Sequence, residues 1–435
     1  MIEEALPKPV LISNHQSNVQ IIKDFTSNLI SSLSSNMFAY GLGLMLLDTT
    51  HSPISFGLNM VISPIVYLLC LVPVGNIVDK YRHKKILSFS LLGRLLILAL
   101  LAFTINLFFG FLKLIPAVIF VGLNAVSLNF TTTAYQSSVH ELVNTGHIQK
   151  LSSLSNTATN ISNILGPVLG VVLYAALGFE TFVLIEILAT IIAFSIMTLM
   201  SFHYEKRDKN PDSEVKTTQN FSLNNFKVGF NYIKNHAWLK IIIFFCVLLN
   251  FLAAAPNLGI SYITKIQLHL GNTPVAFLDT ALGIGLLFGS LFMSMISDKK
   301  GFVYKIFLPI LVFSVSIFLL GFVFNFFNSL FSINLFGGLV MTLFGFSQSV
   351  LNIAVIVKIQ KSVSTKLLGR VISTMMTADM SAAPLGIILF TPLFKTIANG
   401  SYIFIASGII LMVFVSILSI RTIPIFIKLE KNKSF

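Results

Sequence analysis

The amino-acid sequence predicts an all-α integral membrane protein, with twelve transmembrane helices in two pseudo-symmetric six-helix bundles around a central cavity. Its composition, its long apolar runs and the distribution of its cations predict the membrane helices, and an internal repeat and polar helix faces predict the two bundles and the cavity. Of the 435 residues, 55% are hydrophobic and 10% are charged, whereas an ordinary soluble domain is about 25% charged. Since roughly 20 apolar residues cross the hydrocarbon core as a helix, twelve such segments account for most of the chain.

Long apolar runs, separated by turn residues and charges, define the candidate spans. A β-barrel is excluded because the runs are too long and lack alternating hydrophobicity. The spans are expected at 24–47, 54–78, 86–109, 114–138, 149–176, 181–203, 238–264, 275–297, 303–326, 330–357, 367–394 and 400–423. The predicted organisation is an N-terminal tail (1–23), a first bundle (24–203), a linker (204–237), a second bundle (238–424) and a C-terminal tail (425–435).

The positions of lysine and arginine predict the topology. With the N-terminus placed in the cytoplasm, 25 of the 29 Lys and Arg residues fall on the inner side, three on the outer side, and Arg94 lies within a span. This asymmetry is what the positive-inside rule expects. The first 20 residues contain no apolar segment of a signal peptide. We therefore expect a multi-pass protein with both termini in the cytoplasm. Very short outer loops and a Lys-rich, Arg-poor composition suit a bacterial cytoplasmic membrane.

The central linker contains one amphipathic pattern. Phe226, Phe230 and Ile233 recur at i, i+4 and i+7, which predicts a short helix lying on the inner membrane surface. An ordinary lead-in to the seventh span is the alternative.

Two features repeat at nearly the same offset. Asp79-Lys80 after the second span is matched by Asp298-Lys299 after the eighth, 219 residues later, and Gly166-Pro167 in the fifth by Ala383-Pro384 in the eleventh, 217 residues later. Such repeats indicate a duplicated six-helix unit and are typical of secondary transporters.

The loop after the second span resembles the signature of the major facilitator superfamily, Gly-x-x-x-Asp-Arg-x-Gly-Arg-Lys. Gly75, Asp79, Lys80 and Lys84 fit this signature, whereas Arg82 and His83 depart from it. The fifth-span stretch "GPVLG", which contains Gly166, Pro167 and Gly170, resembles the signature of the family's antiporters. Two further stretches, "HELVNTGHIQKLSSLSNTATNISNILGP" and "FKVGFNYIKNHAWLK", resemble the macrolide-efflux-like branch of drug–proton antiporters.

The basic loop is expected to form a conformational latch. Asp79 lies at the inner end of the second span, where it can accept hydrogen bonds from a helix N-terminus. In the architecture that the resemblance implies, this helix is the eleventh span, and the contact breaks in the alternate conformation. A simple balance with the adjacent cations is the alternative. The residues assigned to the latch are Gly75, Asp79, Lys80, Lys84, Asp298, Lys299 and Arg370.

The glycines and proline of "GPVLG" permit close helix packing and bend the fifth span. The alternative is plain packing at a helix crossing, without a role in antiport.

Ionisable residues inside spans are costly and therefore become functional candidates. Asp379 of the eleventh span and Glu186 of the sixth are the predicted proton-coupling carboxyls, with Arg94 as a counter-charge. A carboxyl with little access to water binds a proton more readily. A fixed Arg94–Glu186 ion pair is the alternative. Four acidic residues near span ends are expected to reach water: Asp24, Asp48, Glu180 and Asp279.

Neutral polar residues on four spans predict a water-accessible central cavity, although interhelical hydrogen bonding explains the same pattern. The cavity-lining candidates are Asn28, Asn36, Asn129, Gln136, Asn156, Asn160, Asn163, Gln348 and Asn352. Few fixed charges in this set, together with 41 phenylalanines, favour a bulky amphipathic substrate.

These observations predict a secondary active transporter, with proton-coupled efflux of drugs or amphipathic small molecules (multidrug resistance) by alternating access. The alternatives are an exporter or flippase of one natural product such as a siderophore, peptide or lipid, an uptake symporter, and a non-transporting membrane receptor. No Walker A loop, catalytic cluster or metal-ligand spacing stands out, so we expect no enzyme activity and no cofactor. The expected partners are the lipid bilayer, a small-molecule substrate and protons, with no nucleic acid. We expect the protein to be a monomer.

Overall fold

The computed structural model describes residues 12–50, 58–203, 231–270, 273–296 and 302–431. The chain divides into two compact units. The first comprises Met1–Leu151, Ile161–Asn235 and Ile359–Thr377, and the second comprises Ser152–Asn160, His236–Lys358 and Ala378–Phe435. Each half of the sequence therefore contributes one short segment to the unit built mainly by the other half.

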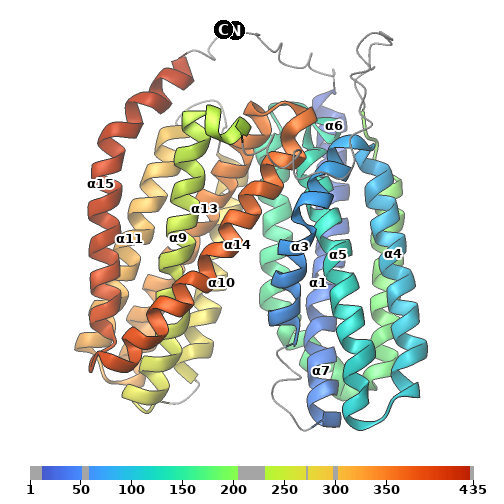
Figure 1. Ribbon diagram of the computed structural model, residues 1–435, viewed down its shortest axis with the longest axis horizontal. Coiled ribbons are helices and arrows are strands. Elements are labelled where there is room, and N and C mark those ends of the chain that lie inside the picture. Colours follow the sequence, from blue (N-terminus) through green and yellow to red (C-terminus); the bar gives the residue numbers. More distant parts are fainter. Residues whose placement is uncertain (1–11, 51–57, 204–230, 271–272, 297–301, 432–435) are drawn as a thin grey trace. The chain divides into compact units, whose positions relative to one another are not determined.

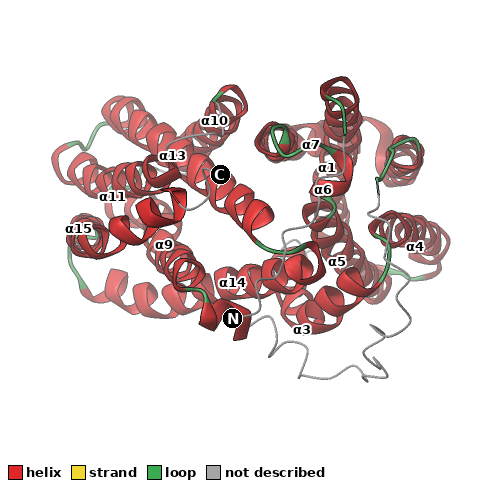
Figure 2. Ribbon diagram, turned by 90° about the horizontal axis from the view of Figure 1, so that it is seen from above, coloured by secondary structure: helices red, strands yellow, loops and turns green. Residues whose placement is uncertain are grey.

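The first unit is a bundle of long helices that run alongside one another (Figures 1 and 2). One of them, α7, is a helix of 51 residues that is interrupted at Gly178, where φ is 72° and ψ is 169°. Because L-residues other than glycine rarely adopt a positive φ, glycine fits this break between two helices. The helices of this unit are α1 (Asn14–Thr50), α3 (Leu58–Lys80), α4 (His83–Thr104), α5 (Leu114–Ser137), α6 (Val139–Leu142) and most of α7 (Ile148–Thr198).

An aromatic cluster holds α1, α5 and the second half of α7 together. The Phe38 ring of α1 stacks on Phe182 of α7, with ring centroids 5.9 Å apart, and meets Phe120 of α5 edge-on at 5.4 Å. All three side chains are buried in one apolar core with Leu42 and Leu98. Such aromatic pairs add to the stabilisation that burial of the side chains gives.

The second unit is also a helical bundle. Its helices are α9 (Ala237–Tyr262, continued by a π-helical turn, Ile263–Gln267), α10 (Thr273–Met295), α11 (Phe302–Phe326), α12 (Leu330–Ser332, continued by a π-helical turn, Ile333–Gly337), α13 (Gly338–Ser362), α14 (Thr365–Thr396) and α15 (Ser401–Lys431). The last turn of α13 and the first part of α14 belong to the first unit.

Glycines let α10 and α13 cross closely in the second unit. A Cβ atom at Gly285 would lie 2.1 Å from the Thr342 carbonyl oxygen, and one at Gly289 would lie 2.6 Å from that of Phe346. These small residues, four positions apart, form the kind of contact face that membrane helices use for close packing.

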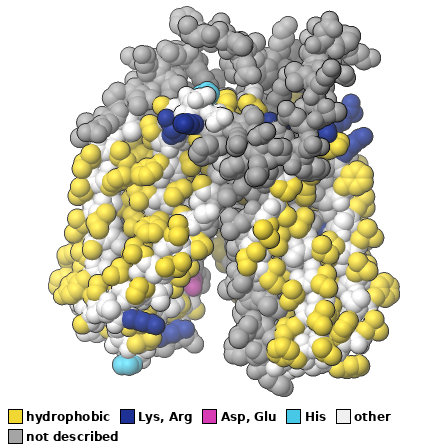
Figure 3. Space-filling model, in the orientation of Figure 1, with side chains coloured by type: hydrophobic (Ala, Val, Ile, Leu, Met, Phe, Trp, Pro, Cys, Tyr) yellow, Lys and Arg dark blue, Asp and Glu magenta, His cyan; other side chains and the backbone are white. Residues whose placement is uncertain are grey.

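The all-α fold class is confirmed, since the described residues contain helices and no strands. Each predicted span coincides with a helix, and α7 carries two of them on either side of Gly178. By length and composition, nine helical segments of the described chain could cross a membrane, with α7 counted once. Hydrophobic side chains cover the visible flank of each unit (Figure 3), as expected for a surface in contact with lipid.

The predicted interfacial helix lies largely outside the described residues, which exclude Phe226 and Phe230. Residues 231–235 are helical, and Ile233 is only 6% exposed. The surface helix therefore stays a prediction.

Candidate functional site

In the first unit, the end of α3 meets the beginning of α14 at an acidic residue. Asp79 accepts a hydrogen bond from the backbone N–H of Gly369 on Oδ1 (2.9 Å) and one from that of Arg370 on Oδ2 (3.3 Å). The Arg370 Nε atom lies 3.1 Å from the same Oδ2, and the Asp79 side chain is 2% exposed. A carboxylate near a helix N-terminus is stabilised by the amides and by the helix dipole.

Glycines on both helices make this approach possible. A Cβ atom at Gly369 would lie 2.6 Å from the Asp79 Oδ1 atom, so a larger residue there would displace the carboxylate. One at Gly75 would lie 2.5 Å from the Ser373 hydroxyl oxygen. Gly75, Asp79 and Arg370, three of the predicted latch residues, therefore come together in the structure, and their switching role stays a prediction.

Two further predicted latch residues, Lys80 and Lys84, do not bind Asp79 in the structure. The Lys84 ammonium donates hydrogen bonds to the carbonyl oxygens of Thr198 and Met200, each at 2.8 Å, at the C-terminal end of α7. Lys80 is exposed, with its ammonium 5.6 Å from the centre of the Tyr81 ring. Lys84 instead interacts with the negative end of a helix dipole. Asp298 and Lys299 lie outside the described residues.

A second contact, which sequence reasoning missed, ties the last turn of α13 to the region around α6. His140 Nε2 is hydrogen-bonded to the Gln360 carbonyl oxygen. The Gln360 side-chain amide donates to the Gln136 carbonyl oxygen at 3.0 Å. Residues 220 or more positions apart thus come together, and no periodicity in the sequence signals such a pair.

Burial lowers the pKa of His140 below its ordinary value of 6.5, and the nearby Lys361 lowers it further. The hydrogen bond with Gln360 and the charge of Glu141 act in the opposite direction. The lowered pKa leaves His140 neutral at neutral pH, and a neutral imidazole donates from one nitrogen only. The contact with a carbonyl oxygen requires the tautomer with its proton on Nε2.

Within the membrane-spanning part of the first unit, Arg94 of α4 forms an ion pair with Glu186 of α7. Both side chains are 2% exposed. Arg94 also donates to the hydroxyls of Ser31 (3.2 Å) and Ser35 on α1. The structure thus contains the ion pair that the sequence left open as the alternative to proton coupling by Glu186.

The "GPVLG" stretch of α7 packs directly on α1. A Cβ atom at Gly166 would lie 2.6 Å from the Asn36 Cβ, and one at Gly170 would lie 2.8 Å from the Met37 carbonyl oxygen. Beside this crossing, Asn36 donates to Asn163 at 2.8 Å. The motif therefore brings two helix backbones together in the first unit.

Several cavity-lining candidates are engaged in hydrogen bonds between or within helices. In the second unit, Asn160 of α7 donates to the Leu286 carbonyl oxygen of α10 at 3.0 Å, and the neighbouring Thr157 bonds to Ser290 at 2.8 Å. Within single helices, Asn156 donates to Ser152 O, Asn28 accepts from Ser32, and the buried Asn129 accepts from Thr133.

Fewer of the cavity-lining candidates are at least partly exposed and without such hydrogen bonds to described residues. On α13, whose neighbouring positions are mostly buried, Asn352 is exposed and Gln348 is partly exposed. Gln136 is partly buried, and its Oε1 atom has no hydrogen-bond partner among the described residues. A central cavity lined by these groups stays a prediction.

Asp379 of α14 differs from Glu186 in its surroundings. It is partly buried in the second unit, and the described residues supply no salt-bridge partner for it. Its Oδ1 atom is buried and has no hydrogen-bond partner within the described part of the chain. An isolated buried carboxylate is costly, whereas the protonated acid costs much less. The described residues therefore supply neither a counter-charge nor a hydrogen-bond donor to the buried Oδ1 atom of Asp379.

One expectation about acidic residues is wrong. Asp24 of α1 does not reach water freely but is 5% exposed, because it lies on the face of α1 that also buries Gln20 and Ser27. Asp48 is exposed, as expected, and accepts a hydrogen bond from Tyr174 at 2.8 Å. Within the described residues, no three His, Cys, Asp or Glu side chains gather as a metal site, and Cys70 and Cys246 are unpaired thiols.

Two bundles of long apolar helices, with buried charges inside predicted spans, are typical of secondary transporters. The sequence matches the Major Facilitator Superfamily over residues 25–387. The chain therefore belongs to this family and is a membrane transporter of that type. The members of the family are transporters, not enzymes.

The chain is also similar to individual proteins in sequence or in fold. It is 25% identical over 415 residues to the uncharacterized MFS-type transporter YkuC of Bacillus subtilis (strain 168), covering 92% of this chain and 91% of YkuC. The fold is similar to that of the human organic anion transporter MFSD10 (TETRAN), with a TM-score of 0.71, 13% identity and coverage of 91% and 99% of the two chains. It is also similar to a bacterial homologue of the iron transporter ferroportin, with a TM-score of 0.70, 11% identity and coverage of 92% and 99%.

Proposed function

We propose that this protein is a secondary active exporter that couples the efflux of drugs or other amphipathic small molecules to proton entry. The observation that carries the coupling is Asp379, a partly buried carboxyl in the predicted eleventh span (α14) without a cationic partner among the described residues. Such a group can change its protonation state during a transport cycle, because no fixed counter-charge holds it in the ionised form.

Glu186 is the second coupling candidate, with Arg94 as its counter-charge. The two side chains form an ion pair with almost no exposure. Protonation of Glu186 would leave the Arg94 charge buried without its partner, which is costly. This asymmetry favours Asp379 as the titrating group and a structural role for the ion pair.

Alternating access requires contacts that form in one state and break in another. We propose that the hydrogen bonds from Gly369 and Arg370 to Asp79 are such a latch. In support, α14 is divided between the two compact units, with residues up to Thr377 in the first and those from Ala378 in the second. Release of Asp79 would free the beginning of α14 from α3.

The direction of transport and the substrate class are inferred from a helix motif and from neutral polar side chains. The sequence of Gly166, Pro167 and Gly170 resembles the antiporter signature and favours export over uptake. Asn352 and Gln348 on α13 supply neutral polar groups, which suit an amphipathic molecule better than a small anion. A dedicated exporter or flippase of one natural product is the second candidate, and it uses the same residues.

Everted membrane vesicles test this proposal. With an imposed pH gradient, acid inside, and no ATP, we expect vesicles with the wild-type protein to accumulate amphipathic cationic dyes and to dissipate the gradient as they do so. Vesicles with Asp379→Asn should accumulate none above the empty membrane, whereas Glu180→Gln, a change at an exposed carboxyl near Asn106, should behave as wild type. Uptake without an effect on the gradient would contradict proton coupling. Accumulation only in right-side-out vesicles would contradict export.

A further inference from the structure

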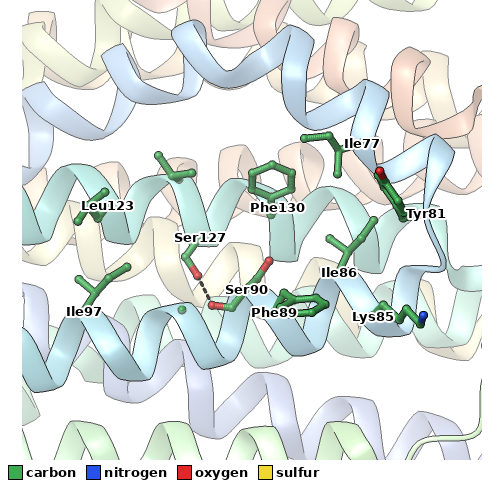
Figure 4. Close-up of a pocket in the computed structure, with 12 residues that line it drawn as sticks. Ile77, Tyr81, Lys85, Ile86, Phe89, Ser90, Ile97, Leu123, Ser127 and Phe130 are labelled. Atoms are coloured by element: carbon green, nitrogen blue, oxygen red, sulfur yellow. Dashed lines mark hydrogen bonds between the residues drawn. The ribbon is translucent and has the colours of Figure 1, made fainter. Parts of the chain in front are cut away.

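A largely apolar groove runs along a flank of the first unit, between α3, α4 and α5 (Figure 4). Its volume is about 500 Å³. The groove is open at the surface, since Phe89 on its wall is 74% exposed. Its apolar lining includes Ile77 at the end of α3, Ile86, Phe89 and Ile97 of α4, and Leu123 and Phe130 of α5.

The interior of the groove offers little to a polar ligand. Ser127 of α5 also lines it, but its hydroxyl donates to the Ser90 carbonyl oxygen of α4 at 2.7 Å. Figure 4 shows this bond crossing between the two helices. The serine hydroxyl is therefore already used for helix packing, and the occupant of the interior must be apolar.

Polar and cationic groups gather at one end of the groove. Tyr81 and Lys85 line this end, opposite Ile97 and Leu123 (Figure 4). Lys85 is exposed, and its side-chain ammonium forms no hydrogen bond or ion pair with another described residue. The neighbouring Lys84, by contrast, donates to the carbonyl oxygens of Thr198, the last residue of α7, and of Met200 just beyond it. Lys85 is thus the lysine of this pair that remains available for an external anion.

The groove has the length of one membrane leaflet. From Lys85 to Ile97, α4 advances by about 18 Å at 1.5 Å per residue, and half of a typical hydrocarbon core measures roughly 15 Å. Lys85 therefore lies at headgroup depth when Ile97 lies near the bilayer midplane. An occupant with an apolar chain of one-leaflet length and an anionic end complements this surface.

We propose that the groove is a specific binding site for an anionic glycerophospholipid. One acyl chain lies between α4 and α5, and the phosphate lies against the Lys85 ammonium and the Tyr81 hydroxyl. The exposed Lys80 and Arg82 of the same loop add positive potential, which attracts anionic over zwitterionic lipids. This site is independent of the substrate and coupling proposed above.

Two glycines provide matched variants to test the apolar part of the site. Gly93 lines the groove, and a Cβ atom there would meet no other atom within 4 Å. A Gly93→Phe side chain would therefore occupy the space assigned to the acyl chain. Gly122 of α5 is equally unobstructed but does not line the groove, so Gly122→Phe is the matched control.

Native mass spectrometry of the full chain in detergent tests the proposal, with phosphatidylglycerol and phosphatidylcholine of identical acyl chains as probes. We expect tighter retention of phosphatidylglycerol by the wild type. Lys85→Gln should weaken its binding about fivefold, as expected for one cation near an anionic lipid, and Lys113→Gln, at the other end of the α4–α5 pair, should not. Gly93→Phe should abolish binding of the retained lipid, and Gly122→Phe should not.

Three results would overturn the proposal. Equal retention of the two lipids would show that the cationic end does not select the headgroup. Unchanged binding by Gly93→Phe would place the lipid elsewhere. Competition by glycerol phosphate, which lacks acyl chains, at the same concentration as the lipid would show that the site binds a soluble phosphate. Thermal unfolding of each variant establishes that it is folded, and Lys85→Gln, an exposed change, tests the headgroup contact even if Gly93→Phe does not fold.

Discussion

The Asp79 Oδ1 atom lies 2.9 Å from the backbone nitrogen of Gly369, a residue 290 positions later in the chain. This contact joins α3 of the first half of the sequence to the beginning of α14 of the second half, within one compact unit. Gly369 allows it because no Cβ stands between the carboxylate and the amide.

Gly369→Ala should break this contact, since its methyl group would lie 2.6 Å from the Asp79 oxygen. We expect the free energy of unfolding to fall by about 1–3 kcal/mol, the cost of leaving a buried polar group unsatisfied. Ser373→Cys, placed in a background without Cys70 and Cys246, reports the opening because Ser373 is buried. Its thiol should react faster with a maleimide in the Gly369→Ala protein.

Gly75→Ala is the comparison for this variant. The atom nearest to its new methyl group is the Ser373 hydroxyl oxygen, which can move away by side-chain rotation. The loss of stability should therefore be smaller than for Gly369→Ala. Thermal unfolding compares the two alanine variants, both without the Ser373→Cys change. If the two alanine variants unfold alike, and Gly369→Ala leaves the thiol as protected as before, the latch does not depend on the Asp79–Gly369 approach.

Arg94→Leu should destabilise the first unit strongly, by about 3–5 kcal/mol, because it leaves the Glu186 charge buried without its partner. Arg94→Leu combined with Glu186→Leu should recover most of this loss, since both charges are then removed. Thermal unfolding in detergent, measured by the recovery of monodisperse protein after heating, distinguishes these outcomes. A double variant as unstable as the single one would show that the buried ion pair is not the source of the loss.

Gly170→Ala should separate α1 and α7, because the new Cβ would lie 2.8 Å from the Met37 carbonyl oxygen, a backbone atom that cannot rotate away. Overpacking of this kind costs roughly 1–3 kcal/mol. Gly122→Ala, where a Cβ meets nothing within 4 Å, is the control. Thermal midpoints of the two variants should differ by several degrees, and equal midpoints would contradict the close crossing.

The pH dependence of stability should reveal His140. Since burial lowers its pKa in the folded protein, the unfolded chain binds this proton more readily than the folded chain does. The stability contributed by the neutral side chain is complete above pH 6.5 and is lost as the pH falls through the lowered folded-state pKa. The thermal midpoint of the wild type should therefore fall between pH 7.5 and pH 5 by more than that of His140→Gln. An equal decrease of the thermal midpoint in both proteins would show that His140 is not the source of this pH dependence.

The sequence predicted the helical fold well because the membrane imposes simple rules. Apolar length and the placement of Lys and Arg give the spans, and the break of α7 at Gly178 falls between two predicted spans. Asp79 and Gly369-Arg370 could be connected because the basic loop resembles a family signature. The approach of Gln360 to His140 and Gln136 could not, since it depends on how the ends of distant helices meet.

Position along a helix was also a poor guide to the surroundings of acidic residues. Asp24 lies near the end of a predicted span, yet the packing around α1 buries it. In the sequence, Glu186 and Asp379 were both coupling candidates, and an ion pair of Glu186 with Arg94 was left open as the alternative. The structure contains that ion pair, whereas the described residues provide no cation for Asp379.

The most direct test of proton coupling is to compare two transport modes of purified Asp379→Asn protein in liposomes. An amide cannot carry the proton, but it preserves the size and polarity of the side chain. We predict that the variant retains exchange of labelled for unlabelled substrate, which needs no proton movement, and loses uptake driven by a pH gradient. Gradient-driven uptake equal to that of the wild type would contradict the assignment of Asp379 as the coupling carboxyl.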